Sequence, residues 1–121
     1  HDFHGAIADF DHAIKLNPKY AAAYANRGNA RAENDDLDGG IADLDRAITL
    51  NSKNAVAYYQ RAYAKRRKKD TTGAIADYTR AIELDGKDGD FYNERGDVWL
   101  EKKQYGAAVD DIQKAIQLDP K

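Results

Sequence analysis

A repeat of 34 residues runs through the sequence and constrains its fold more than any other feature. When the sequence is shifted against itself by 34 residues, four segments align, as expected for an array of equivalent structural units. The segments are AIADFDHAIKLNPK (6–19), GIADLDRAITLNSK (40–53), AIADYTRAIELDGK (74–87) and AVDDIQKAIQLDPK (108–121). Units of this kind bury a continuous core only by stacking on one another.

Each unit is expected to contain two helices. Apolar residues step by four and three in successive copies, at Phe3, Ile7, Phe10 and Ile14, and at Leu37, Ile41, Leu44 and Ile48. This spacing places them on one helix face, and no segment alternates as a strand would. Asp2, Asp36 and Asp70 precede such segments as expected N-caps. The predicted helices are 2–16, 21–34, 37–50, 55–68, 71–84, 89–102 and 105–118.

A second set of residues recurs between the aligned segments: Tyr24, Arg27 and Gly28, then Tyr58, Arg61 and Ala62, then Tyr92, Arg95 and Gly96. A helix–turn–helix unit of this length, with these residues and the recurring alanines, resembles the tetratricopeptide repeat. The resemblance covers essentially the whole chain. It implies an all-α fold, a right-handed solenoid of about seven helices in antiparallel pairs. The expected single domain, 1–121, comprises the second helix of a partial repeat (1–20) and three repeats (21–54, 55–88 and 89–121).

Arginine recurs where the family commonly has leucine, at Arg27, Arg61 and Arg95. An aspartate also recurs in all four copies, at Asp9, Asp43, Asp77 and Asp111. We expect ion pairs between helices, each arginine pairing with the aspartate of the preceding copy, which leaves Asp111 over. The alternative is that each arginine is solvated beside an unrelated surface aspartate, an arrangement that contributes less than about 1 kcal/mol.

Function is expected where the copies differ, because residues repeated in every unit perform the same packing task. The resemblance implies that the first helix of each repeat lines a concave groove that holds an extended peptide or a partner helix. The candidate groove residues are Ala22, Ala25, Asn29 and Glu33; Val56, Tyr59, Tyr63 and Arg66; and Asp90, Asn93, Asp97 and Glu101. The first row is small, the second aromatic and cationic, and the third acidic, which indicates a partner of mixed charge.

Tyr59 and Tyr63 lie one helical turn apart and are suited to stacking on a ligand, with Arg66 and Arg67 placed to bind a carboxylate. An equally weighted interpretation is that both tyrosines only cover neighbouring helices. One subfamily binds a terminal carboxylate through lysine, asparagine and arginine at five fixed places. Only Asn29 matches here, and the other places hold Ala25, Gln60, Asp90 and Glu94. No such clamp is expected.

Composition and the remaining motifs exclude other functional classes. The net charge is only −2 and there is no cysteine, so neither an overall field nor thiolate chemistry directs the function. The basic run 65–69 closes a predicted helix, where cations complement the helix dipole, and we expect no nucleic-acid partner. No apolar run is long enough to span a membrane. With Ser52 as the only serine, no catalytic constellation is visible; we expect no enzyme and no cofactor.

Two weaker motifs point to metals. Asn34 to Asp45 resembles a calcium-binding loop, but the repeat requires 37–50 to be helical. His1, His4 and His12 cluster near one end of the sequence, where frayed terminal residues are the simpler interpretation. We expect no metal site from either motif.

The sequence therefore predicts a protein-interaction scaffold. One alternative is a homo-oligomer formed through uncapped solenoid ends, near Val109, Ile112 and Ile116 or near Phe3, Ile7 and Phe10. Another is an engineered or recently duplicated array with no specific ligand. The absence of methionine indicates a segment of a longer protein, and the sequence carries no information on localisation.

Overall fold

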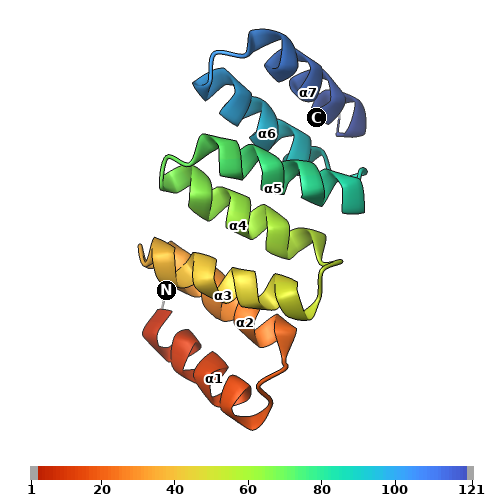
Figure 1. Ribbon diagram of the computed structural model, residues 1–121. Helices are drawn as coiled ribbons and strands as arrows, with labels where there is room; N and C mark the ends of the chain where they lie inside the picture. The colour runs from red at the N-terminus through yellow and green to blue at the C-terminus, as the bar shows by residue number, and fades with distance from the viewer. Residues whose placement is uncertain (1–2, 120–121) are drawn as a thin grey trace.

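The computed structural model describes residues 3–119, which form a row of helices and no strand. The helices are α1 (Phe3–Leu16), α2 (Ala21–Glu33), α3 (Leu37–Leu50), α4 (Ala55–Arg67), α5 (Thr71–Leu84), α6 (Gly89–Glu101) and α7 (Tyr105–Leu118). Helices adjacent in sequence are adjacent in space, and they stack in one direction from α1 to α7 (Figure 1). The expected all-α solenoid is confirmed.

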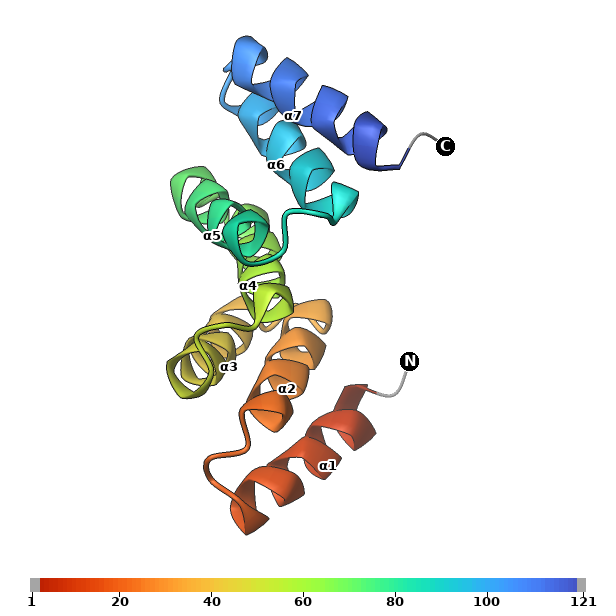
Figure 2. The ribbon, with the colours of Figure 1, turned by 90° about the vertical axis from the view of Figure 1, so that its right-hand side faces the viewer.

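The stack is curved, and this curvature separates two kinds of helix. Figure 2 shows the start of α1 and the end of α7 on one side and α3 and α5 on the opposite side. Helices α2, α4 and α6, the first helices of the three pairs, lie on the inner side. This arrangement gives the concave surface that stacked repeats use for binding.

The predicted helix boundaries agree with the structure to within one residue. The first helices of the pairs end at Glu33, Arg67 and Glu101, one residue earlier than predicted. Asp36 and Asp70 are the predicted N-caps, and each carboxylate accepts a bond of 3.0 Å from the amide three residues later. Asp2, the third predicted cap, lies outside the described residues.

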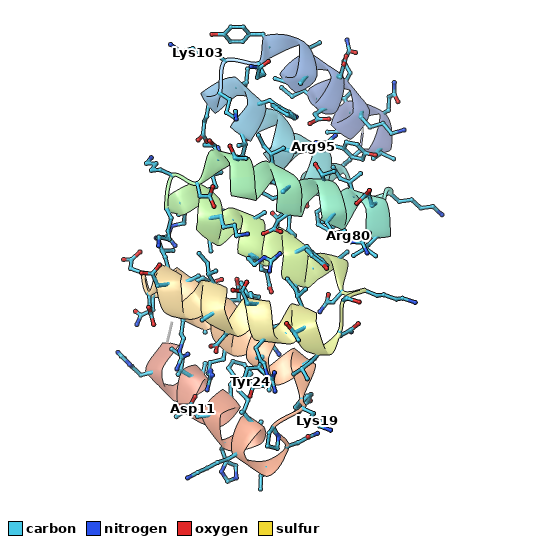
Figure 3. The ribbon with its side chains drawn as sticks, in the orientation of Figure 1. Asp11, Lys19, Tyr24, Arg80, Arg95 and Lys103 are labelled. Atoms are coloured by element: carbon cyan, nitrogen blue, oxygen red, sulfur yellow. The ribbon has the colours of Figure 1, made fainter. Side chains whose placement is uncertain are left out.

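The turn between the two helices of each pair contains a residue in the left-handed backbone conformation. Asp35, Lys69 and Lys103 have φ angles of 66°, 71° and 62°, a conformation that normally favours glycine. The next amide then bonds back to the preceding helix, as Asp70 N–H does to the Lys65 carbonyl at 2.9 Å. Lys103 extends from the α6–α7 turn into solvent (Figure 3).

Small residues let the paired helices touch at the backbone. A Cβ atom added to Gly28 of α2 would lie 2.8 Å from the Gly40 carbonyl oxygen of α3, and one added to Gly40 would lie 2.7 Å from that of Gly28. Around such contacts the core is built mainly from alanines and a few large side chains. The buried large residues are Leu44, Ile48, Tyr58, Tyr78, Phe91 and Val98.

Candidate functional site

A hollow of about 540 Å³ opens on the inner side between α2 and α4. Its lining residues are Asn29, Glu33, Val56, Tyr59, Gln60, Tyr63 and Arg67. Five of these, Asn29, Glu33, Val56, Tyr59 and Tyr63, are groove residues expected from the sequence. Gln60 and Arg67 line it as well, although the groove list omitted them. Val56 and Tyr63 are 53% and 44% exposed, so apolar surface faces solvent here.

The two tyrosines of α4 have different environments. The Tyr59 ring centroid lies 5.0 Å from that of Phe91 and 5.7 Å from that of Tyr78, so Tyr59 connects α4 with α5 and α6. Burial raises the pKa of Tyr59 to about 12, with the charges of Glu94 and Asp90 adding to the effect. Tyr63 instead leaves its ring available at the surface. Tyr59 therefore covers neighbouring helices as well as lining the hollow, whereas the Tyr63 ring is exposed.

Arg66 and Arg67 point in different directions from the end of α4. Arg66 does not line the hollow; its Nε lies 2.6 Å from Glu101 Oε1 and its Nη1 3.2 Å from Glu94 Oε2, both on α6. Arg67 lines the hollow, donates to the Ala32 carbonyl oxygen at 2.7 Å and forms an ion pair with Asp35. Both guanidinium groups, which the sequence suggested for a ligand carboxylate, are thus engaged within the chain.

The third row of groove residues lies on α6, outside the hollow. Asn93 and Asp97 are accessible or partly accessible there, and Glu101 is shared with Arg66. Glu94 belongs to this surface too; burial raises its pKa, and nearby Asp97 and Asp90 raise it further while Arg66 opposes the shift. In the first row, Ala25 is 6% exposed and Asn29 donates to Glu33 at 3.1 Å.

The recurring arginines pair with aspartates, but in a different copy from the one expected. Nε and Nη2 of Arg61 each lie 2.7 Å from a carboxylate oxygen of Asp77. Arg27 binds Asp43, and Arg95 binds Asp111, with the same two-bond geometry. The predicted pairing with the preceding copy is therefore wrong, and no aspartate is left over at 111. The reason is that each first helix packs most closely on the second helix of its own pair.

The preceding copy satisfies the remaining nitrogen of each arginine. Nη1 of Arg27 lies 2.7 Å from Asp11, that of Arg61 lies 2.8 Å from Asp45, and that of Arg95 lies 3.1 Å from the Thr79 hydroxyl. Each guanidinium also lies over the ring of the tyrosine three residues earlier, at 5.5 to 5.7 Å. Figure 3 shows Asp11 and Tyr24 where α1 meets the α2–α3 pair. The recurring tyrosine, arginine and aspartate are thus one structural unit.

The basic run at the end of α4 is largely neutralised by the chain itself. Lys65 Nζ lies 3.1 Å from Asp77, and Lys68 forms an ion pair with Asp38. Arg66 and Arg67 have the partners given above. Four of the five cations therefore face carboxylates of neighbouring helices or, for Arg67, of the α2–α3 turn. These pairs add to the helix-dipole explanation drawn from the sequence.

The metal motifs do not assemble a site in the part of the chain that is described. Residues 37–50 are helical in α3, so the calcium-loop conformation is absent there. His4 and His12 are exposed on α1, and His1 lies outside the described residues. Within residues 3–119 no three ligating side chains come together, and no helix has the length and apolar character needed to cross a membrane.

Comparisons with known proteins agree with this geometry. The family model described as Tetratricopeptide repeat matches residues 1–55 and 59–121. The crystal structure of MamA superposes with a TM-score of 0.93 at 25% identity, covering 98% of this chain and 70% of that one.

A second MamA structure, residues 41-end from Desulfovibrio magneticus RS-1, shares 20% identity at a TM-score of 0.91, with coverages of 98% and 67%; it shows the fold alone. The Arabidopsis OM64 TPR domain has a TM-score of 0.80 at 29% identity and 84% coverage of each chain. No curated protein sequence matches this chain.

Proposed function

Because the chain belongs to the tetratricopeptide repeat family, we propose that it is a protein-interaction scaffold that binds an extended peptide or a partner helix on its concave side. The observation that carries the proposal is the open hollow between α2 and α4. It combines exposed apolar groups, Val56 and Tyr63, with amide and carboxylate groups that suit a peptide backbone. Ligand sites in proteins have this mixture of apolar lining and a few polar groups.

The proposed binding surface runs across all three inner helices. Asn29 and Glu33 of α2 and Tyr59 and Tyr63 of α4 form its first part around the hollow. Its second part consists of Arg66 of α4 with Asn93, Asp97 and Glu101 of α6. Most of these positions differ between neighbouring repeats, as Asn29, Tyr63 and Asp97 do, in contrast to the tyrosine–arginine–aspartate units that hold the fold. A binding role is proposed for them and no catalytic one.

The test is a matched pair of tyrosine substitutions. Tyr63→Ala removes the exposed ring from the hollow, whereas Tyr105→Ala removes a tyrosine that is 61% exposed on α7. Binding of a fluorescein-labelled random nonapeptide library is measured by anisotropy for both variants and the unaltered chain. We expect Tyr63→Ala to weaken binding several-fold and Tyr105→Ala to leave it unchanged. Equal effects of the two variants would contradict a groove at Tyr63.

Self-association stays a prediction, and one observation favours it as the second candidate. Ile116 and Val109 of α7 are 58% and 51% exposed, whereas Ile48, which holds the place of Ile116 two repeats earlier, is 9% exposed. Burying such side chains is favourable by roughly 1.5–3 kcal/mol each. Light scattering over a concentration series, on the intact chain and on Ile116→Lys, tests it. A monomer at every concentration would refute it.

A further inference from the structure

The charges of the concave surface are not balanced. Its cations, Arg66 and Arg67, each have a carboxylate partner within the chain. Asp90 and Asp97 of α6 have no ion pair within residues 3–119, although both are close enough to Glu94 to raise its pKa. The α6 side of the groove therefore carries carboxylates that the chain itself does not neutralise.

The acidic surface and the hollow meet at Tyr59. The Tyr59 side chain lines the hollow, and its ring centroid lies 5.0 Å from that of Phe91, the neighbour of Asp90 in α6. Burial raises the pKa of its phenol, and the negative charges of Glu94, Asp90 and Asp88 raise it further. Tyr63, one turn further along α4, adds an exposed aromatic face. Tyrosine rings attract ammonium and guanidinium groups, more strongly where water is partly excluded. Aromatic faces and carboxylates thus adjoin on one surface, an arrangement that suits a cation.

The polar groups beneath this surface are incompletely satisfied. The Tyr78 ring is fully buried among Ala62, Ala74 and Val98. Its hydroxyl faces Arg66 and Glu94 without the geometry of a full hydrogen bond to either. The charges of Glu94 and Arg66 act on that phenol in opposite directions, which places it beside their ion pair. Buried hydroxyls without partners are uncommon in proteins. An acidic ligand would compete with Glu94 and Glu101 for Arg66 and would leave these two carboxylates without their cation.

We propose that the concave groove binds an extended peptide segment bearing a lysine or arginine, with the cation on the surface formed by Tyr63 of α4 and Asp90 and Asp97 of α6. An adjoining side chain of the peptide then occupies the hollow between α2 and α4. The inference rests on the proposed function and specifies its ligand. It replaces the partner of mixed charge expected from the sequence, because Arg66 is already bound by two carboxylates.

The test uses four fluorescein-labelled nonapeptide libraries, blocked at both ends, with uncharged residues at every position but the central one. The central residue is Arg, Lys, Glu or Leu, and binding is measured by anisotropy. We expect the Arg and Lys libraries to bind more tightly than the other two. Asp97→Asn should weaken their binding by about two- to fivefold, the range of an exposed ion pair. Asp110→Asn, an exposed aspartate on α7, is the matched control and should change nothing.

A second variant, Arg66→Gln, should change the affinity for basic ligands and for acidic ligands in opposite directions. Arg66→Gln frees Glu94 and Glu101, so it should strengthen binding of the Arg library; a ligand with a carboxylate would instead bind more weakly. Lys68→Gln, which removes a cation paired with Asp38 outside the groove, is the control. Thermal melting confirms that each variant folds. If Arg66→Gln does not fold, the comparison of Asp97→Asn with Asp110→Asn still tests the inference.

The outcomes separate this inference from the function on which it rests. Tighter binding of the Glu library, or weaker Arg-library binding by folded Arg66→Gln, would overturn the basic ligand. Equal binding of the Leu and Arg libraries, lost in Tyr63→Ala, would overturn it while the scaffold stands. If no library binds, both proposals fail.

Discussion

Arg61→Leu tests whether the arginine–aspartate pairs hold the helix pairs together. Arg61 makes two bonds to Asp77, one bond to Asp45, and lies over the Tyr58 ring. The Asp77 side chain is only 6% exposed and that of Arg61 17%. Leucine keeps the apolar volume, so the substitution chiefly removes the charge-assisted bonds and leaves Asp77 buried with Lys65 alone.

The expected loss follows from these contacts. Removing one partner of a buried ion pair typically costs about 3–5 kcal/mol. Lys65 remains 3.1 Å from Asp77 and reduces that cost, while the bond to Asp45, whose side chain is 56% exposed, contributes less than about 1 kcal/mol. We therefore expect the free energy of unfolding to fall by about 2–4 kcal/mol. For a chain of this size that corresponds to a melting temperature lower by roughly 6–16 °C.

The assay is urea unfolding followed by circular dichroism, with Arg80→Leu as the matched control. The Arg80 side chain is 46% exposed, its contact with Glu83 is 3.6 Å long, and it lies 5.9 Å from the centre of the Tyr58 ring, so its loss should cost only about 1 kcal/mol. The double variant Arg61→Leu with Asp77→Leu should lose less stability than the sum of the single variants, because neither charge is left buried alone. If Arg61→Leu were no more destabilising than Arg80→Leu, the pairs would be ordinary surface contacts.

Three further substitutions test other features of the structure by unfolding measurements. Lys103→Gly should raise stability by about 0.5–1 kcal/mol, because Lys103 has a φ of 62° that glycine adopts without strain; Lys102→Gly, at a φ of −85°, should bring no gain. Gly28→Val should cost about 2–3 kcal/mol through its clash with the Gly40 carbonyl, whereas Gly106→Ala, with open space around it, should not destabilise. The Glu94 pKa is raised above its ordinary value of 4.5, so the folded chain binds this proton more tightly than the unfolded chain does. The free energy of unfolding therefore falls as the pH rises from 4.5 through the pKa of folded Glu94. Glu94→Gln should flatten that dependence, and an unchanged slope would show that Glu94 is not responsible.

The helices could be predicted from the sequence because the same pattern occurs in every copy. Apolar spacing defines each second helix, and a capping aspartate precedes α3 and α5. Because the copies are in register, the bounds of one helix indicate the bounds of the others. The one-residue difference at the ends of α2, α4 and α6 arises at the turns. There Asp35, Lys69 and Lys103 adopt a left-handed conformation that a non-glycine residue does not reveal in a sequence.

The ion pairs show which information a repeat does not contain. Arg27 is separated by nearly equal lengths of chain from Asp9 before it and Asp43 after it, so a periodic sequence allows either partner. Packing decides between them, because the two helices of a pair approach at Gly28 and Gly40. The same limit applies to Arg66 and Arg67. Consecutive residues of a helix point about 100° apart, and only the structure shows which one faces the hollow.

The three tyrosine–arginine–aspartate units are not equivalent, and the difference affects the helices that form the proposed groove. Arg27 and Arg61 reach a carboxylate of the preceding helix pair, whereas Arg95 reaches the Thr79 hydroxyl. A neutral hydroxyl binds a guanidinium less strongly than a carboxylate does, so the junction of the α4–α5 pair with the α6–α7 pair lacks one ionic link. The two bonds of Arg66 to α6 lie across this same junction. Arg66 therefore holds α6, which carries the acidic surface, against α4, which carries the hollow. If the proposed groove is correct, ligand binding and repeat stacking share this one side chain.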